Sequence, residues 1–265
     1  MLSRVLEVFF LPAADPVAAK LPFLDSAWPT TILLFSYLAF VLKWGKIFME
    51  DRRPFNLTKI LIWYNIFQVI YNFLMFSAGI YVFFIKPIYD LKCMPTIALD
   101  HPNKNTERVL GYIYFINKII DLLDTIFFVL RKSYKQITVL HVFHHVLMVF
   151  VIYWVVRFYG VGGQFMVMGL LNTFVHTVMY FYYMVSAKYS GLKGSIWWKK
   201  YITLIQIIQF IIVLSQSVYI YFFNSQCKFP TSLQFLISSC ASLFIVMFTS
   251  FYIKTYTTSR PQKQH

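Results

Sequence analysis

Seven long apolar runs constrain the fold of this chain more than any other feature of its sequence. Each run approaches or exceeds the roughly 20 residues that a helix needs to cross a bilayer, and together they cover residues 28–49, 57–85, 109–130, 136–156, 164–185, 201–223 and 233–253. Charged residues make up 13% of the chain, against about a quarter in a soluble domain. The sequence therefore predicts an all-α integral membrane protein, a single domain over residues 1–265, with seven transmembrane helices and a short tail over 254–265.

Lysine and arginine in the connections predict the orientation of this domain. The first, third and fifth connections and the C-terminal tail hold 15 of the 24 basic residues, and the opposite side holds 8. Because basic residues near span ends stay in the cytoplasm, we expect the N-terminus outside it and the C-terminus inside it. Cys93 and Cys227 then share the non-cytoplasmic side, where an oxidising lumen would permit a disulfide. Two free thiols are an equal alternative at this stage.

The run His-Val-Phe-His-His places three imidazoles, His141, His144 and His145, in an otherwise apolar span. Positions i, i+3 and i+4 share one face of a helix, so the three side chains converge. Ionisable groups inside a span mark a functional site by default. A lone buried histidine is usually structural, but three on one face, with His176 in another span, favour a site.

Three polar stripes accompany the histidines on other spans. The third, fifth and sixth spans carry, in order, Lys118, Asp121, Asp124 and Thr125; Asn172, His176, Met179, Tyr180 and Tyr183; and Thr203, Gln206 and Gln209. Each group follows helical spacing, and polar groups within a membrane need partners, so we expect all four stripes to face a common interior. Packing of Tyr and Met, glutamine bonds between helices and a structural Lys118–Asp121 ion pair are the simpler alternatives.

The residue types leave two main chemistries open. Imidazoles spaced i, i+3 and i+4 can hold one metal ion facially, which would make a histidine-ligated membrane metalloenzyme acting on lipids, such as a hydroxylase or desaturase. A di-iron site of that kind needs about eight histidines, and the chain has six. Covalent acyl transfer with imidazole as nucleophile is the second chemistry, and it needs bases and carboxylates but no metal. A seven-span receptor is a third and weaker alternative.

Four motifs carry a resemblance to a known family. In chain order they are Lys118-Ile-Ile-Asp121-Leu-Leu-Asp124-Thr125, His141-Val-Phe-His144-His145, His176-Thr-Val-Met179-Tyr180 and Gln206-Ile-Ile-Gln209. Together with the length and span count, they resemble the very-long-chain fatty acid elongase (ELO) family. One residue departs from the family pattern, because Asp121 stands where the family usually has Glu.

The resemblance implies a fold and a reaction. Family members resemble a six-helix barrel around an acyl tunnel, with a seventh, peripheral helix, in the endoplasmic reticulum membrane. They act as a very-long-chain 3-oxoacyl-CoA synthase, in which acyl-CoA and malonyl-CoA give 3-oxoacyl-CoA, CO2 and CoA, without a cofactor or metal. Val-Phe inside the histidine motif, where the subgroup acting on saturated C16 chains has Trp-Tyr, favours long and very-long acyl groups.

The same resemblance implies roles for individual residues and partners. His144 would carry the acyl group as an acyl-imidazole and His176 would assist malonyl-CoA, with His141 and His145 as proton shuttles and Asp121 and Asp124 fixing tautomers. Supporting residues would be Lys118, Thr125, Asn172, Met179, Tyr180, Gln206 and Gln209, and the CoA phosphates would meet Arg131, Lys199, Lys200 and Lys254. Expected partners are long-chain acyl-CoA, malonyl-CoA, membrane lipid and the other elongation enzymes. A homodimer is left open, and nucleic acid is not expected.

Overall fold

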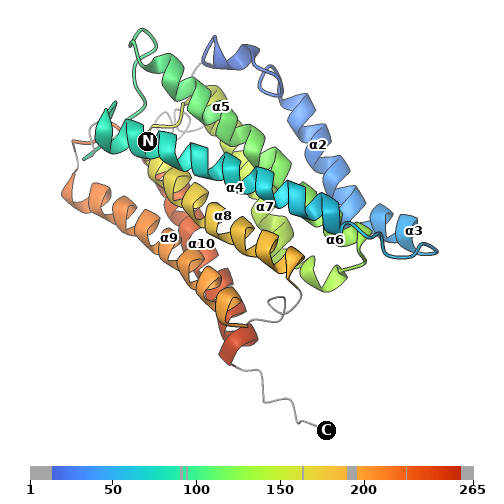
Figure 1. Cartoon of the computed structure of the whole chain (residues 1–265). Helices are drawn as coiled ribbons and strands as arrows, with labels where there is room; N and C mark the ends of the chain where they lie inside the picture. Colours follow the sequence, from blue (N-terminus) through green and yellow to red (C-terminus); the bar gives the residue numbers. More distant parts are fainter. Residues whose placement is uncertain are drawn as a thin grey trace, which may run out of the picture. The chain divides into compact units, whose positions relative to one another are not determined.

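The computed structural model describes residues 14–89, 92–93, 95–162, 164–189, 196–224 and 226–257. Every regular element in these ranges is a helix or a helical turn (Figure 1). The chain divides into two compact units, the first made of residues 1–57 and 96–162, the second of residues 58–95 and 163–265. Residues 258–265 of the predicted tail lie outside the described residues.

The described part of the first unit contains three long helical segments. Its elements are η1 (Ala18–Lys20), α2 (Ala27–Ala39), η2 (Phe40–Trp44), α3 (Gly45–Met49), α5 (Lys104–Asp121), α6 (Leu123–Leu130), η4 (Tyr134–Gln136) and α7 (Val139–Phe158). The π-helical turn η2 joins α2 to α3 without a break in the helical segment. Helix α5 packs along α7, with the rings of Phe115 and Tyr153 6.3 Å apart.

Gly45 permits a close approach between α3 and α6 in this unit. A Cβ atom there would lie 2.7 Å from the carbonyl oxygen of Phe40 and 2.7 Å from a methyl carbon of Val129. Such distances are well inside van der Waals contact, so a larger residue would push the two helices apart. The absence of a side chain is therefore a packing requirement at this position.

In the second unit, the described residues form four long helical segments. Its elements are α4 (Thr58–Ile80), η3 (Tyr81–Ile85), α8 (Gln164–Lys188), α9 (Ile196–Phe223), α10 (Thr231–Tyr252) and η6 (Ile253–Thr257). Figure 1 shows α4 beside α8 and α9 beside α10, and these pairs are in contact. Aromatic contacts join each pair: Phe76 with Phe174 at 5.5 Å, and Phe210 with Phe244 at 5.1 Å.

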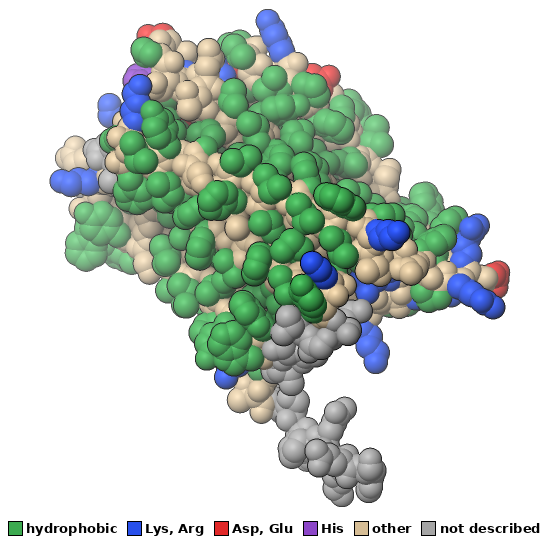
Figure 2. Space-filling model, viewed as in Figure 1, with side chains coloured by type: hydrophobic (Ala, Val, Ile, Leu, Met, Phe, Trp, Pro, Cys, Tyr) green, Lys and Arg blue, Asp and Glu red, His purple; other side chains and the backbone are tan. Residues whose placement is uncertain are grey.

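Among the described residues, six helical segments are long and apolar enough to cross a membrane. They are Ala27–Met49, Thr58–Ile85, Val139–Phe158, Gln164–Lys188, Trp197–Phe223 and Thr231–Thr257. Their bounds lie within a few residues of six of the seven predicted spans. Their exposed side chains are largely apolar, among them Phe35, Trp63 and Phe235, as expected for helices that face lipid. Figure 2 shows apolar side chains over much of the visible face.

The third predicted span, residues 109–130, differs from the prediction. Helix α5 begins earlier, at Lys104, and ends at Asp121, and α6 follows after the single residue Leu122. The N–H of Leu122 donates to the carbonyl of Ile119, three residues back, so one tightened turn separates the helices. The segment is not among the six apolar spans because α5 carries several charges, Lys118 and Asp121 included. Seven helices and a barrel stay predictions.

Candidate functional site

The three clustered histidines lie in the first two turns of α7. The helix is capped by Thr138, whose Oγ1 accepts a hydrogen bond from the backbone N–H of His141 at 3.2 Å. Such a cap satisfies one of the free donors of the first turn. The ring centroids of His141 and His145 are 4.4 Å apart, and those of His144 and His145 are 5.7 Å apart. The three imidazoles are therefore neighbours, as their spacing predicts.

Thr125 connects this histidine cluster to two further helices. Its Oγ1 lies 2.9 Å from Nε2 of His141 and 2.7 Å from the hydroxyl oxygen of Tyr37. Because a hydroxyl both donates and accepts hydrogen bonds, buried Thr125 can accept a hydrogen bond from one partner and donate one to the other, and it thereby orients the His141 ring. Tyr37, on α2, was missed by the sequence analysis, since it stands alone in an apolar run.

A buried ion pair lies near the end of α5. Nζ of Lys118 donates to Oδ2 of Asp121 at 2.7 Å, and the two side chains are 2% and 1% exposed. The ammonium also lies 5.0 Å from the ring centroid of Tyr114, within reach of a cation–π interaction. Asp124 follows on α6 and is half-buried. The pair keeps a carboxylate and an ammonium together where a single charge would be strongly unfavourable.

The predicted residues of α8 belong to the second unit, and four of them are buried. These are Asn172, His176, Met179 and Tyr180. The ring of Tyr180 meets His176 edge-on, with centroids 5.7 Å apart and planes at 67°. Tyr183, which the spacing assigns to the same stripe, is instead 39% exposed. The buried stripe therefore ends at Tyr180.

A polar stripe on α4 was missed by the sequence analysis. Asn65, Gln68 and Asn72 are all buried, and Gln68 reaches the hydroxyl groups of Tyr64 and Tyr180. Their spacing of three and four residues is helical and was visible in the sequence. No charge or histidine accompanies the stripe, and this is why it did not stand out among the apolar residues of the second span.

Helix α9 adds the two predicted glutamines to this unit. Nε2 of Gln206 lies 4.0 Å from Sδ of Met179, the range of a weak bond to sulfur. Gln209 is buried. Thr203, one turn earlier, donates to the carbonyl of Lys199 at 3.0 Å. The predicted α8 and α9 residues are thus in contact through Met179.

The predicted phosphate-binding residues divide between the two units. Lys199 and Lys200, at the start of α9, and Lys254, in η6, are exposed. Nζ of Lys200 lies 6.0 Å from the ring centroid of Tyr252, so these lysines share one end of the second unit. Arg131 follows α6 in the first unit.

Cys93 and Cys227 form a disulfide within the second unit. Their Cα atoms are 5.3 Å apart, and 134 positions separate them in the sequence. Next to it, Nδ2 of Asn224 donates to the carbonyl of Lys92 at 2.8 Å. The connection before α10 is therefore tied to the connection after α4. Cys240 is a free thiol on α10.

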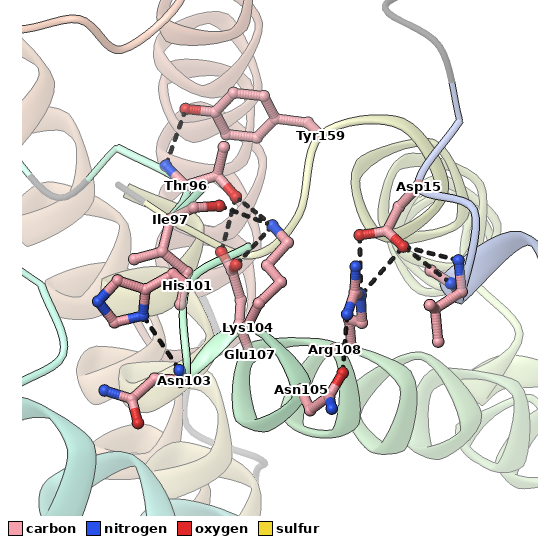
Figure 3. Close-up of polar contacts among 12 residues, drawn as sticks. Asp15, Thr96, Ile97, His101, Asn103, Lys104, Asn105, Glu107, Arg108 and Tyr159 are labelled. Carbon is pink, nitrogen blue, oxygen red and sulfur yellow. Dashed lines mark hydrogen bonds and ion pairs between the residues drawn. The ribbon is translucent and has the colours of Figure 1, made fainter. Parts of the chain in front are cut away.

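A second buried ion pair on α5 lies outside the predicted site. Nζ of Lys104 donates to Oε2 of Glu107 at 2.7 Å, to Oγ1 of Thr96 at 2.9 Å and to the carbonyl of Ile97 at 3.0 Å (Figure 3). Gly160 lies against this cluster with φ of +100°, and a Cβ atom there would crowd Thr96 and Glu107. Both the positive φ and the close approach require glycine.

Two further contacts extend this network at the end of α7 and before α2. Burial raises the pKa of Tyr159 to about 12, and the negative charge of Glu107 raises it further. The backbone N–H of Thr96 donates to the Tyr159 hydroxyl oxygen at 3.5 Å and opposes this rise in pKa.

Asp15 accepts hydrogen bonds from Nε of Arg108 at 2.9 and 3.0 Å (Figure 3). Burial works against ionisation of Asp15, yet this bond and two backbone N–H groups lower its pKa. The network fastens the segment before α2 to α5.

The described residues contain no group of three or more His, Cys, Asp or Glu side chains arranged to hold a metal ion. The histidine cluster of α7 supplies imidazoles, and the hydroxyl of Thr125 lies next to His141. The polar residues of the first and second units provide imidazole nitrogens that can act as nucleophiles or bases. They also provide hydroxyl and amide donors and the buried Lys118–Asp121 ion pair.

Comparisons with known proteins identify relatives along most of the chain. Residues 22–264 match the model of the ELO, or GNS1/SUR4, family. Very long chain fatty acid elongase F of Drosophila melanogaster is 41% identical over 242 residues, which cover 91% of this chain and 93% of the relative. Very long chain fatty acid elongase 4 of Mus musculus is 33% identical over 254 residues, which cover 94% of this chain and 78% of the relative.

Proposed function

The chain belongs to the ELO (GNS1/SUR4) family of very long chain fatty acid elongases, and we propose that it is the condensing enzyme of the elongation cycle. In this reaction acyl-CoA and malonyl-CoA give 3-oxoacyl-CoA, CO2 and CoA, so the protein is a very-long-chain 3-oxoacyl-CoA synthase. The observation that carries the proposal is the cluster of three imidazoles at the start of α7, next to the hydroxyl of Thr125.

The first half-reaction needs a nucleophile that takes the acyl group from CoA. Cys93 and Cys227 are consumed in a disulfide, and Cys240 lies on α10, which carries none of the predicted polar stripes. We assign the nucleophile to His144: its ring nitrogen attacks the thioester carbonyl, the C–S bond breaks, and the CoA thiolate leaves with a proton. His141 and His145 hold the ring and move protons.

The charges of the first unit support this half-reaction. Asp121 and Asp124 are assigned to fixing the protonation state of the imidazoles, because a carboxylate raises the basicity of a neighbouring ring. Lys118 balances the carboxylates through its bond to Asp121. Thr125 orients His141.

The second half-reaction is assigned to the second unit. There His176 assists the loss of CO2 from malonyl-CoA; the electron pair of the broken C–C bond forms an enolate that attacks the acyl carbonyl, and the C–N bond to His144 breaks. Asn172, Met179, Tyr180, Gln206 and Gln209 complete the polar environment of His176. Stabilising the negative charge that develops on the enolate is the largest contribution expected of such groups.

Membrane placement and partners follow from the same proposal. A disulfide forms in an oxidising compartment, so we place the loops around Cys93 and Cys227 in the lumen of the endoplasmic reticulum. The N-terminus is then luminal and the C-terminus cytosolic. Arg131, Lys199, Lys200 and Lys254 are assigned to the CoA phosphates on the cytosolic side. The partners are long-chain acyl-CoA, malonyl-CoA, membrane lipid and the other elongation enzymes, with a homodimer left open and no cofactor.

Purified protein, a panel of acyl-CoA chain lengths and labelled malonyl-CoA test the reaction directly. Formation of 3-oxoacyl-CoA by the wild type is the expected result. His144→Ala abolishes both product and the covalent acyl adduct in the intact mass spectrum, and an adduct that survives this change moves the nucleophile elsewhere. His176→Ala retains the adduct and loses condensation. Stoichiometric iron or zinc, with activity lost to a chelator, would favour the metalloenzyme alternative, and binding without turnover would favour a receptor.

A further inference from the structure

Gln68 of α4 lies between two tyrosine hydroxyl groups. Its Nε2 donates to the oxygen of Tyr64 at 3.3 Å and to the oxygen of Tyr180 at 3.4 Å. Gln68 and Tyr180 are both 0% exposed. Nδ2 of Asn72 donates to the backbone carbonyl of Gln68 at 2.9 Å and lies 3.5 Å from its Oε1. A row of hydrogen bonds therefore follows one face of α4 and ends on α8.

Tyr180 connects this row of hydrogen bonds to His176, the residue assigned to the decarboxylation step. Its ring stands edge-on to Tyr64, with centroids 5.9 Å apart and planes at 85°, and edge-on to His176 at 5.7 Å. The Tyr180 ring is thus held between α4 and the histidine of its own helix. Any change that lets this ring turn also changes the surface against which His176 packs.

The direction of the hydrogen bond gives the Tyr180 hydroxyl a chemical role. Because Gln68 donates, the phenol oxygen of Tyr180 accepts this hydrogen bond, and a phenol O–H is itself a hydrogen-bond donor. A hydroxyl that accepts one hydrogen bond donates a stronger one, since hydrogen-bond chains polarise each other. The Tyr180 ring stands edge-on to His176, and a phenol donor on that ring suits the enolate oxygen that becomes negative when malonyl-CoA loses CO2.

We propose that Gln68 and Tyr64 are positioning residues for the decarboxylation half-reaction, which they serve by holding Tyr180 so that its hydroxyl donates to the enolate oxygen. The proton stays on Tyr180 throughout, and the electron pair of the breaking C–C bond passes to the enolate. This inference rests on the proposed function and assigns residues that lie outside the four family motifs. A purely structural role, as polar glue between two helices, is the alternative to be separated.

The test compares the two half-reactions in full-length protein. The variants are Gln68→Met, which removes the amide at similar length, Tyr64→Phe and Tyr180→Phe. Ser77→Ala is the matched control, because the Ser77 hydroxyl only bonds the carbonyl of Phe73 on the same exposed helix face. The acyl adduct forms with acyl-CoA alone and is followed by intact mass, and release of labelled CO2 from malonyl-CoA follows the second half-reaction.

Gln68→Met and Tyr64→Phe are expected to form the adduct within about twofold of the wild-type rate and to lower kcat of condensation by about three- to tenfold, the range for one hydrogen bond. The KM for malonyl-CoA stays within about twofold, since the interaction is made in the transition state. The double variant Gln68→Met with Tyr180→Phe is no slower than Tyr180→Phe alone, because both act through one hydroxyl. Ser77→Ala behaves as the wild type.

Four results would overturn the inference. Equal losses in both half-reactions mean that Gln68 is structural, and multiplying losses in the double variant mean that it does not act through Tyr180. A wild-type protein that condenses normally beside an unchanged Gln68→Met variant removes the inference and leaves the proposed function intact. A wild type that makes no 3-oxoacyl-CoA removes the proposed function and this inference with it.

Discussion

Two lysine–carboxylate pairs on α5 allow the catalytic and structural roles of a buried ion pair to be separated. Lys104 with Glu107 and Lys118 with Asp121 share i, i+3 spacing and a distance of 2.7 Å from Nζ to the carboxylate oxygen. Their side chains are 4% and 1% exposed in the first pair, and 2% and 1% in the second. Only the second pair belongs to the proposed site, so the first is its matched control.

The perturbation is Asp121→Asn, compared with Glu107→Gln. Each change removes one negative charge at nearly constant volume and leaves a buried ammonium without that carboxylate. Breaking a buried pair in this way costs about 3–5 kcal/mol. Lys104 keeps its hydrogen bonds to Thr96 and Ile97, so we expect Glu107→Gln at the lower end of that range. At about 2–4 °C per kcal/mol for a chain of this size, either variant lowers Tm by at least about 6 °C.

Activity then separates the two variants. Tm is measured by tryptophan fluorescence in detergent, and condensation is measured at a temperature where both variants are folded, per amount of folded protein. Glu107→Gln is expected within about threefold of the wild type, whereas Asp121→Asn loses at least about a hundredfold, the scale of acid–base assistance by a side chain. Asp121→Glu keeps the charge and restores most of the activity.

One pattern of results refutes this reasoning. If both variants lose activity only in proportion to their loss of Tm, the Lys118–Asp121 pair is structural, and the assignment of Asp121 to the acylation machinery is wrong. Full activity in a destabilised Asp121→Asn variant leads to the same conclusion. A normal Tm in both variants would contradict the burial argument instead.

Three further predictions concern the frame around the site. Cys227→Ser frees Cys93, shifts mobility on non-reducing gels and lowers stability by about 2–4 kcal/mol; unchanged mobility contradicts the disulfide. Gly45→Ala forces its Cβ against Val129, and overpacking of this kind costs about 1–3 kcal/mol, seen as a lower Tm. Asp15→Asn lowers Tm at neutral pH. Because folding lowers the pKa of Asp15, the carboxylate stabilises the fold above its unfolded-state pKa, and this stabilisation is lost as pH falls through the folded-state pKa. A difference in Tm between variant and wild type that persists below the folded-state pKa contradicts the pairing with Arg108.

Apolar length predicts most of the fold and fails at one helix for a physical reason. A run of about 20 apolar residues has few alternatives to a spanning helix, and six predicted spans match the helical segments closely. Helix α5 instead begins in a charged stretch, because Lys104 and Glu107 satisfy each other within the helix. A hydropathy pattern cannot register a charge that is neutralised by a neighbour one turn away.

The candidate site shows the same division between local and tertiary information. Spacing along one helix places His141, His144 and His145 together, and this local rule predicts their contacts. The hydrogen bond between Tyr37 and Thr125 joins residues 88 positions apart, and no local pattern contains it. Gln68 is an intermediate case: its spacing from Asn65 and Asn72 is visible in the sequence, but its tie to Tyr180 depends on how α4 packs on α8.

The disulfide gives an argument about the number of spans that hydropathy alone does not give. A bond between Cys93 and Cys227 requires both residues on one side of the membrane, so the chain between them crosses it an even number of times. Three of the apolar segments, Val139–Phe158, Gln164–Lys188 and Trp197–Phe223, lie in that interval. An odd number would separate the cysteines, so the prediction of seven spans needs α5 and α6 together as the fourth crossing. On that prediction the charged segment lies inside the membrane, where the Lys118–Asp121 pair keeps two charges together that would be strongly unfavourable singly.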